Sequence, residues 1–427
     1  MPETVIDLAK NLSTKELELL RKIGDLAGSG GAGAWLVGGI VRDLILGVGS
    51  ADLDIVIEGD GLAFARKASK ELVANLIEYE KFLTATLQFP DLTRVDIATA
   101  RTETYERPGS LPVVARAKVR DDMRRRDFTI NAMAVSLSKD RFGGLFDPFG
   151  GASDIAGKVV RILHDRSFLD DPTRILRGVR FEVRFGFMLE PGTMNLLKGA
   201  LAGGAFESIS GDRLREEIFL GFYEPDPEGF FSRLHGLGIL GEILPGADPC
   251  GPFPGYLRDA RQVSALVEKG KHWDSAVLGL LLLMRGASGE QVLRVADRLN
   301  LTASGRRALS YAPDITRLAR EAEDSVMSGL HGMLAEVPYE VRLAVLVMME
   351  GEVPRRMLVE YMRHGRDIRS EVNGDDLVKM GYKRGPGLRR ILEALLREKM
   401  DGNVNGREEE EKFVRENFSA PDGEALA

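Results

Sequence analysis

Cysteine is almost absent from this sequence. Cys250 is the one cysteine in 427 residues, so the chain can form no internal disulfide, which is typical of proteins in a reducing compartment. Long apolar stretches are missing as well, because the longest, AVLGLLLLM at 276–284, is too short to span a bilayer. The first residues lack the apolar core of a secretion signal. Together these features predict a cytoplasmic protein without a membrane partner.

An overall excess of positive charge is also lacking. The 58 Lys and Arg residues are outnumbered by 65 Asp and Glu residues, which leaves a net charge of −7 and argues against a nucleic-acid interface over the whole surface. Basic residues are concentrated in RAKVRDDMRRR at 116–126 and in KMGYKRGPGLRRILEALLREK at 379–399. Either segment alone could be a solvated helix face, but two of them in an acidic chain indicate local contacts with phosphates.

The apolar pattern predicts two kinds of region. With 44% apolar and 29% charged residues, the chain has the composition of a folded protein of about two to four domains. Up to residue 150, short β-rich segments alternate with helical patterns, as in an α/β or α+β domain. We expect strands at 35–39, 53–57, 84–89, 94–98 and 145–149 and a helix over 61–76. Beyond residue 151 the patterns are helical almost throughout.

Two acids flank the first residue of the strand expected at 53–57. Strand side chains alternate between faces, so Asp52 and Asp54 should project to one side and Leu53 to the other. Charges that face a packed layer are costly unless they are paired or bound to a metal. Two carboxylates on one face suit Mg²⁺, which usually takes one or two protein carboxylates together with substrate phosphates. The alternative is an edge strand that carries acids for solubility.

The residues just upstream favour the metal interpretation. Gly38 and Gly39 allow a phosphate to approach the backbone, and a helix that starts near Ile40 presents free N–H groups at its positive end. Arg42, in the first turn, can reach an anion bound there. This combination predicts a site that handles a nucleotide.

Asp96 is a candidate for a third carboxylate. It lies mid-strand in TRVDIATAR at 93–101, among apolar residues where packing gives no reason for an acid. A third acid would complete a two-metal site. The alternative is a structural ion pair with a nearby arginine, Arg94 or Arg101.

Four segments, in their order and spacing, carry a family resemblance. They are LVGGIVRDLILG with ADLDIV at 36–56, RRRDFTINAMA at 124–134, DPFGG at 147–151 and DDPTRILRGVRF at 170–181. The chain thereby resembles the bacterial tRNA nucleotidyltransferase and poly(A) polymerase family, the class II branch within the polymerase β superfamily. The resemblance implies an α+β fold, with a polymerase β-like nucleotidyltransferase head that holds a mixed sheet, followed by an all-helical neck, body and tail. We expect the head at 28–150, the neck at 151–230, the body at 231–350 and the tail at 351–427.

The resemblance also implies roles for residues of these motifs. Asp52 and Asp54 would hold two Mg²⁺ ions, next to the third carboxylate predicted above. Asp127 would orient its neighbours, and Asn131 would steady the ribose or the fold. The nucleotide-binding residues that we expect in the head are Gly38, Gly39, Arg42 and Arg126.

The last motif would choose the base. Asp171 and Arg174, three residues apart on a helix, share one face. There the carboxylate can accept from an exocyclic amino group and the guanidinium can donate to a ring nitrogen. Cytosine and adenine both offer these two groups, whereas uracil and guanine reverse them and would leave buried groups unpaired, at about 1–3 kcal/mol each. The resemblance implies that Arg177 and Arg180 also contact the nucleotide; the alternative is a surface ridge of arginines.

The implied partners are CTP, ATP and the 3′ end and acceptor stem of tRNA, with no obligate protein partner. RNA phosphates are expected to contact four residues of the tail, Lys383, Arg384, Arg389 and Arg390. The implied activity is addition or repair of the terminal CCA of tRNA without a template. Alternatives that stay open are an enzyme that adds only A or only CC, a poly(A) polymerase, a small-molecule nucleotidyltransferase and an RNA-binding protein without activity.

Two further segments bear on these alternatives. Residues 102–123, rich in Gly and Pro, are expected to form a mobile loop with Pro108 and Gly109 as hinges, which the resemblance links to the use of ATP. His164 and Asp165 could begin a phosphohydrolase site of the His-Asp type. The other histidines show no second His-Asp pair, so we expect His164 to be structural.

Overall fold

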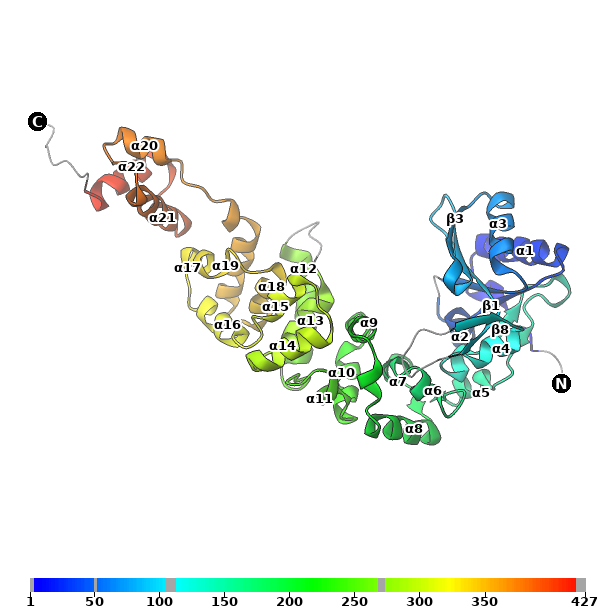
Figure 1. Cartoon of the computed structure of the whole chain (residues 1–427). Coiled ribbons are helices and arrows are strands. Elements are labelled where there is room, and N and C mark those ends of the chain that lie inside the picture. Colours follow the sequence, from blue (N-terminus) through cyan, green and yellow to red (C-terminus); the bar gives the residue numbers. More distant parts are fainter. Residues whose placement is uncertain (1–3, 50–51, 105–112, 268–272, 420–427) are drawn as a thin grey trace, which may run out of the picture. The chain divides into compact units, whose positions relative to one another are not determined.

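The computed structural model describes residues 4–49, 52–104, 113–267 and 273–419. The chain divides into two compact units, Met1–Leu234 and His235–Ala427, which Figure 1 colours from blue to green and from green to red. This division lies close to the boundary expected between neck and body, and the finer division into four domains stays a prediction. None of the helices among the described residues is long and apolar enough to cross a membrane.

A mixed sheet of seven strands forms the centre of the first unit. The strand order is β3-β4-β5-β2-β1-β8-β9, in which β2 and β5 run parallel and all other neighbours antiparallel. The mixed sheet confirms the α+β head predicted from the sequence, and all five expected strands are present. The strands are β1 (Gly33–Val37), β2 (Leu53–Glu58), β3 (Asn75–Tyr79), β4 (Thr84–Gln88), β5 (Arg94–Thr99), β8 (Ala134–Ser136) and β9 (Leu145–Phe146).

The two faces of this sheet differ in chemistry. Helix α3 (Gly61–Glu71) packs on one face, where Arg66 of α3 pairs with Glu78 of β3 at 2.6 Å. Strand alternation gives that face the buried residues Ile55 and Ile97. The opposite face carries Asp54 and its neighbours. Burial of β2 on the helix-covered face therefore fixes which face presents the acids.

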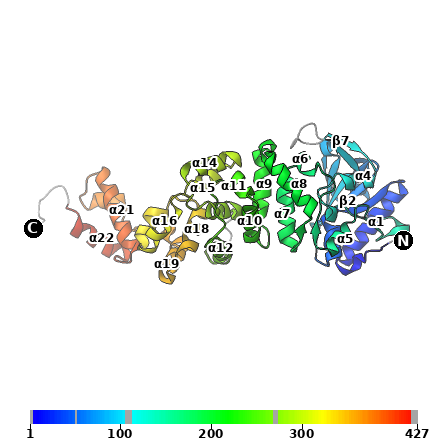
Figure 2. The same cartoon turned by 90° about the horizontal axis from the view of Figure 1, so that it is seen from below.

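Ten α-helices, α1 to α10, belong to the described part of the first unit, and α10 runs past its end. Helices α7 and α9 pack side by side (Figure 2). Besides α3, the ten α-helices of this unit are α1 (Thr14–Ser29), α2 (Gly39–Leu46), α4 (Val119–Arg124), α5 (Gly151–Ala156), α6 (Ser167–Asp170), α7 (Thr173–Phe185), α8 (Pro191–Ala202), α9 (Gly211–Phe222) and α10 (Pro227–Gly236).

Three expectations about local structure were wrong in part. The helix expected over 61–76 ends at Glu71, because Val73 has a φ of 56° that no α-helix can continue through, and the edge strand β3 follows. The loop expected over 102–123 is largely regular in the parts that the structure describes, 102–104 and 113–123: β6 (Arg101–Thr104) pairs with β7 (Val113–Arg116), and α4 follows. Its expected hinges, Pro108 and Gly109, lie outside the described residues. The neck also contains the two-residue strands β10 (Val159–Val160) and β11 (Met188–Leu189).

After α10, every regular element that the structure describes is a helix. The last three, α20 to α22, form their own small core around residues such as Leu377, Ile391 and Leu395. The helices of this unit are α11 (Ile239–Ile243), α12 (Phe253–Val267), α13 (Ser275–Leu283), α14 (Gly289–Arg298), α15 (Ala303–Leu309), α16 (Ile315–Glu323), α17 (Met327–Leu334), α18 (Tyr339–Met348), α19 (Glu352–Arg363), α20 (Gly374–Lys379), α21 (Pro386–Met400) and α22 (Gly406–Asn417).

A buried ion pair ties this small core together. Glu410 of α22 is fully buried, pairs with Lys399 of α21 at 2.6 Å and accepts hydrogen bonds from the backbone N–H groups of Glu371 and Val372, each at 2.8 Å. Without Glu410, Lys399 keeps the more distant partner Glu371, at 3.3 Å, and two backbone N–H groups lose their acceptor.

We therefore predict that Glu410→Ala destabilises α20–α22 by about 3 kcal/mol. The measurement is hydrogen exchange of the α21 and α22 amides in the full chain. Glu416→Ala is the matched control, because Glu416 lies on the same helix in an exposed pair with Lys412 and should cost less than about 1 kcal/mol. Equal protection in the two variants would contradict the prediction.

Candidate active site

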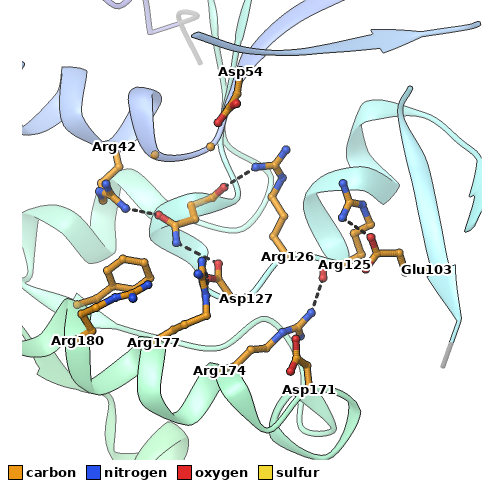
Figure 3. Close-up of a pocket in the computed structure, with 14 residues that line it drawn as sticks. Arg42, Asp54, Glu103, Arg125, Arg126, Asp127, Asp171, Arg174, Arg177 and Arg180 are labelled. Atoms are coloured by element: carbon orange, nitrogen blue, oxygen red, sulfur yellow. Dashed lines mark hydrogen bonds and ion pairs between the residues drawn. The ribbon is translucent and has the colours of Figure 1, made fainter. Parts of the chain in front are cut away.

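An open pocket of about 480 Å³ lies in the first unit. All eight residues predicted to bind a nucleotide line it, together with Asp54 (Figure 3). These eight are Gly38, Gly39, Arg42, Arg126, Asp171, Arg174, Arg177 and Arg180. Residues that are far apart in the sequence therefore meet around one space.

The turn between β1 and α2 forms one wall of this pocket. Gly38 has a φ of 82°, a left-handed conformation that favours glycine. A Cβ atom there would lie 3.2 Å from Nη1 of Arg126 and 3.5 Å from Oδ2 of Asp54. The glycine thus leaves the space between these two side chains open, and α2 begins directly after it at Gly39.

Of the three predicted carboxylates, Asp54 is the one that lines the pocket. Asp52 is exposed just before β2, Leu53 is buried, and Asp54 is half-buried on the open face of the sheet. Strand register places Asp54 directly beside Asp96 of β5. Burial raises the pKa of Asp54, and the negative charges of Asp96 and Asp52 raise it further.

Asp96 also has the structural partners that the alternative interpretation predicted. It pairs with Arg94 at 3.0 Å and accepts a hydrogen bond from Thr86 at 2.5 Å. Arg101 pairs with Glu103 instead. The carboxylate of Asp96 is therefore held in place beside Asp54 by its own neighbours.

The acids suit a hard cation. Mutual repulsion of these carboxylates is relieved by a divalent ion, and oxygen ligands are the ones that Mg²⁺ prefers. Among the residues that the structure describes, no three His, Cys, Asp or Glu side chains are arranged to hold a metal on their own. Asp52 and Asp54 can thus hold Mg²⁺ only with further ligands, such as the phosphates of a bound nucleotide.

A buried polar network fixes the arginines behind this edge. Nη1 of Arg42 donates to Asn131 at 2.7 Å, and the amide of Asn131 donates to Asp127 at 3.0 Å. Asp127 also accepts from Arg177 at 2.7 Å. Burial alone would raise the pKa of Asp127, but Arg177, Asn131 and the backbone lower it to about 2. Asp127 is therefore charged at neutral pH and holds Arg177 at the pocket.

Asp171 and Arg174 both line the pocket. The expectation that they share one helix face was wrong, because Asp171 is extended and precedes α7, whereas Arg174 lies in its first turn. Nη1 of Arg174 donates to Ser167, and Nη2 to the carbonyl oxygen of Arg125, both at 2.8 Å. Asp171 accepts from Nη2 of Arg213 at 2.8 Å. The orientation of both side chains is set by the protein itself, as a base-reading pair requires.

Arg180 is held by acids that sequence reasoning missed. Glu217 of α9 lies 3.1 Å from Arg180, and the buried Glu224 lies 3.4 Å from it. The two contacts are made by Nη1 and Nε of Arg180, which are buried and face these acids without hydrogen-bond geometry. The i, i+4 spacing of Arg213 and Glu217 was the available signal for this row of charges.

The predicted RNA-binding residues lie in the second unit, where they are exposed. Arg384 pairs with Asp375 and Arg389 with Glu393, each at 2.8 Å. Their proposed contact with RNA stays a prediction.

His164 is half-buried, and burial and Arg174 lower its pKa.

Comparisons with known proteins agree with this site. Residues 34–161 match the model of the poly A polymerase head domain. The chain is 33% identical to an A-adding tRNA nucleotidyltransferase of Halalkalibacterium halodurans, and the match covers 98% of this chain and 96% of that protein. It is also 33% identical, over 96% of its length, to an A-adding tRNA nucleotidyltransferase of Geobacter sulfurreducens, of which it spans 48%.

A solved structure shows the same architecture. The apo form II of a CCA-adding enzyme superposes with a TM-score of 0.83 at 32% sequence identity, and the match covers 97% of this chain and 99% of that one. The resemblance inferred from the four motifs is confirmed. The chain belongs to the tRNA nucleotidyltransferase and poly(A) polymerase family.

Proposed function

We propose that this protein adds or repairs the terminal CCA of tRNA, from CTP and ATP and without a nucleic-acid template. One observation carries the proposal: the acidic edge at Asp54 and the pair Asp171 and Arg174 line the same pocket. A triphosphate at the acidic edge and a base at the start of α7 can then belong to one bound nucleotide.

The residues of the pocket have different roles in binding the nucleotide. Arg42, Arg126, Arg177 and Arg180 supply positive charge for the triphosphate and the ribose, and Asp127 fixes the position of Arg177. Asp52 and Asp54 would hold two Mg²⁺ ions, whose charge would activate the 3′-hydroxyl of the RNA and stabilise the leaving pyrophosphate. Asp96 is the third carboxylate that we propose for this site.

Nucleotide transfer needs little covalent chemistry from the protein. The 3′-oxygen of the RNA forms a bond to the α-phosphorus, the bond from this phosphorus to the bridging oxygen breaks, pyrophosphate leaves, and the hydroxyl proton is lost to water. Catalysis of such a reaction is mostly positioning and charge stabilisation. The ion pairs behind the arginines provide the positioning.

Base choice follows from Asp171 and Arg174. Oδ1 of Asp171 already accepts from the backbone and hydroxyl of Thr173 and from Arg213. Oδ2 accepts from Arg213 alone, so it keeps a lone pair that can accept from the amino group of cytosine or adenine. Arg174, held by Ser167 and by a backbone carbonyl, keeps its remaining donors in a fixed direction. Both bases can therefore be read by one pair.

A second candidate is an enzyme that adds only the terminal A. It is favoured by the relatives of Halalkalibacterium and Geobacter, which match 98% and 96% of this chain and carry that name. The motifs are shared by both activities, so the substrates must distinguish them.

The deciding assay offers tRNA transcripts that end at the discriminator base, at C or at CC, with labelled CTP or ATP. We predict incorporation of C into the first two and of A into the third, because one pocket reads both bases. Incorporation of A into the CC-ended transcript alone would show an A-adding enzyme. Incorporation into none of the transcripts, or equally into any RNA, would contradict action on the tRNA 3′ end.

The acidic edge is tested by Asp54→Asn, an isosteric change that removes the charge. We predict that turnover falls at least about 100-fold, because the remaining carboxylates cannot hold the ions. Asp91→Asn is the control, since Asp91 lies in an exposed turn of the same sheet and pairs with Lys15. The readout is single-turnover incorporation together with circular dichroism. Retention by Asp54→Asn of more than about a tenth of wild-type turnover would remove Asp54 from the metal site.

A further inference from the structure

Aromatic rings gather at the end of α7, next to one wall of the nucleotide pocket. Phe181 and Phe185 lie about one turn apart on this helix, and their ring centroids are 6.0 Å apart with planes inclined by 22°. We call these two residues the aromatic pair. Phe187, just after the helix, packs against Phe185 with ring centroids 5.6 Å apart.

The aromatic pair contacts the guanidinium of Arg42. Cζ of Arg42 lies 4.6 Å from the ring centroid of Phe185 and 5.3 Å from that of Phe181, within the range in which a ring face attracts a cation. Arg42 is 5% exposed, whereas Phe185 is half-buried. The apolar ring is thus more exposed than the charge that it contacts, which is the reverse of the order that packing alone produces.

The charge of Arg42 needs compensation because it is buried. Burial lowers the pKa of Arg42, an ion pair of 2.8 Å with Asp43 opposes this effect, and the positive charge of Arg184 adds to it. The faces of aromatic rings carry partial negative charge, and their attraction for a cation is stronger where water is excluded. The aromatic pair therefore supplies compensation in addition to that of the nearby acids.

The guanidinium of Arg42 keeps two donors for a ligand. Nε and Nη2 contact Asp43 at 2.9 and 2.8 Å, and Nη1 donates to Asn131 at 2.7 Å. Each Nη carries two N–H groups, so one N–H of each remains after these contacts. A Cβ atom at Gly39 would lie 3.3 Å from Nη2, so this glycine leaves space beside the guanidinium. Gly39 and Arg42 both line the nucleotide pocket.

We propose that Phe185, together with Phe181, positions Arg42 for the phosphates of the bound nucleotide through cation–π contact. This inference rests on the proposed function. The ring faces limit rotation of the guanidinium, so its two remaining N–H groups stay directed at a phosphate, which a planar fork of donors fits well. Phe181 also contacts Arg177 and Arg180, at 5.5 and 6.0 Å, and lines the pocket itself. Phe185 is therefore the better position for a test of the contact with Arg42.

The first test compares a ligand that has phosphates with one that lacks them. Equilibrium binding of ATP with Mg²⁺, and of adenosine, is measured without RNA on the full chain. Phe185→Leu, which keeps an apolar side chain but no ring, should weaken ATP binding about 3- to 30-fold and leave the affinity for adenosine unchanged. Phe185→Tyr, which keeps the ring face, should restore the affinity for ATP.

The matched control is Phe187→Leu, which removes a ring that contacts Phe185 and should leave the affinity for ATP unchanged. Three results would overturn the proposal: an unchanged affinity for ATP in Phe185→Leu, an equal loss for ATP and adenosine in that variant, or the same loss in Phe187→Leu.

The second test keeps the shape of the ring and changes its charge distribution. Phe185 is replaced in the full chain by a trifluorinated phenylalanine, which removes the negative potential of the ring face and nearly retains its size. We expect the same selective loss of ATP affinity, and this variant decides the question if circular dichroism shows that Phe185→Leu does not fold. ATP affinity equal to that of the wild type would overturn the proposal.

The two proposals fail in different ways. ATP binding that depends on the ring of Phe185, in a protein that incorporates no nucleotide into RNA, would overturn the proposed function and leave the role of Phe185 supported. Nucleotide incorporation together with an ATP affinity that fluorination does not change would overturn the role of Phe185 and leave the proposed function supported.

Discussion

The parallel pairing of β2 with β5 sets Asp54 beside Asp96, and the repulsion between these carboxylates is the constraint on which the rest of the site depends. Two neighbouring acids in a half-buried position are unfavourable unless positive charge is close. The fold supplies part of that charge through Arg94 and Arg126, both of which lower the pKa of Asp54. A divalent ion and the phosphates that it brings would supply the rest. The acids at Asp54 and Asp96 are thus compensated well enough for the sheet to fold, and the negative charge that remains favours binding of a divalent ion.

Buried acids are likewise compensated by the arginines that line the pocket. Asp122 is fully buried, and although burial would raise its pKa, Arg125 and Arg126 hold that pKa below its usual range. Burial raises the pKa of Glu217 against the effect of Arg180 and Arg177. Each of these acids stands behind arginines that line the pocket and fixes them before a nucleotide binds. Binding therefore needs little reorganisation, which is the condition for effective electrostatic stabilisation.

The sequence was sufficient for the parts of the site that lie in local patterns. Alternation along β2 predicted that Leu53 is buried and that Asp54 faces the other way, and the glycine pair predicted the turn that opens the pocket. The i, i+4 spacing of Arg213 and Glu217 marks a charged helix face, but the sequence could not show that this face contacts the pocket residues, because the contact is made through tertiary packing between segments about forty residues apart. It also missed β3, because an exposed edge strand with a short apolar pattern resembles the end of the preceding helix.

We propose that Asp171 and Arg174 read the base in a pocket whose side chains the protein itself holds in position. The most direct measurement is equilibrium binding of CTP, ATP, UTP and GTP, with Mg²⁺ and without RNA, to the wild-type chain and to Arg174→Ala. We predict that the wild type binds CTP and ATP about 5- to 100-fold more tightly than UTP and GTP. We also predict that this preference disappears in Arg174→Ala. An unchanged preference in the variant, with all four affinities reduced equally, would contradict base reading and leave Arg174 as a phosphate contact.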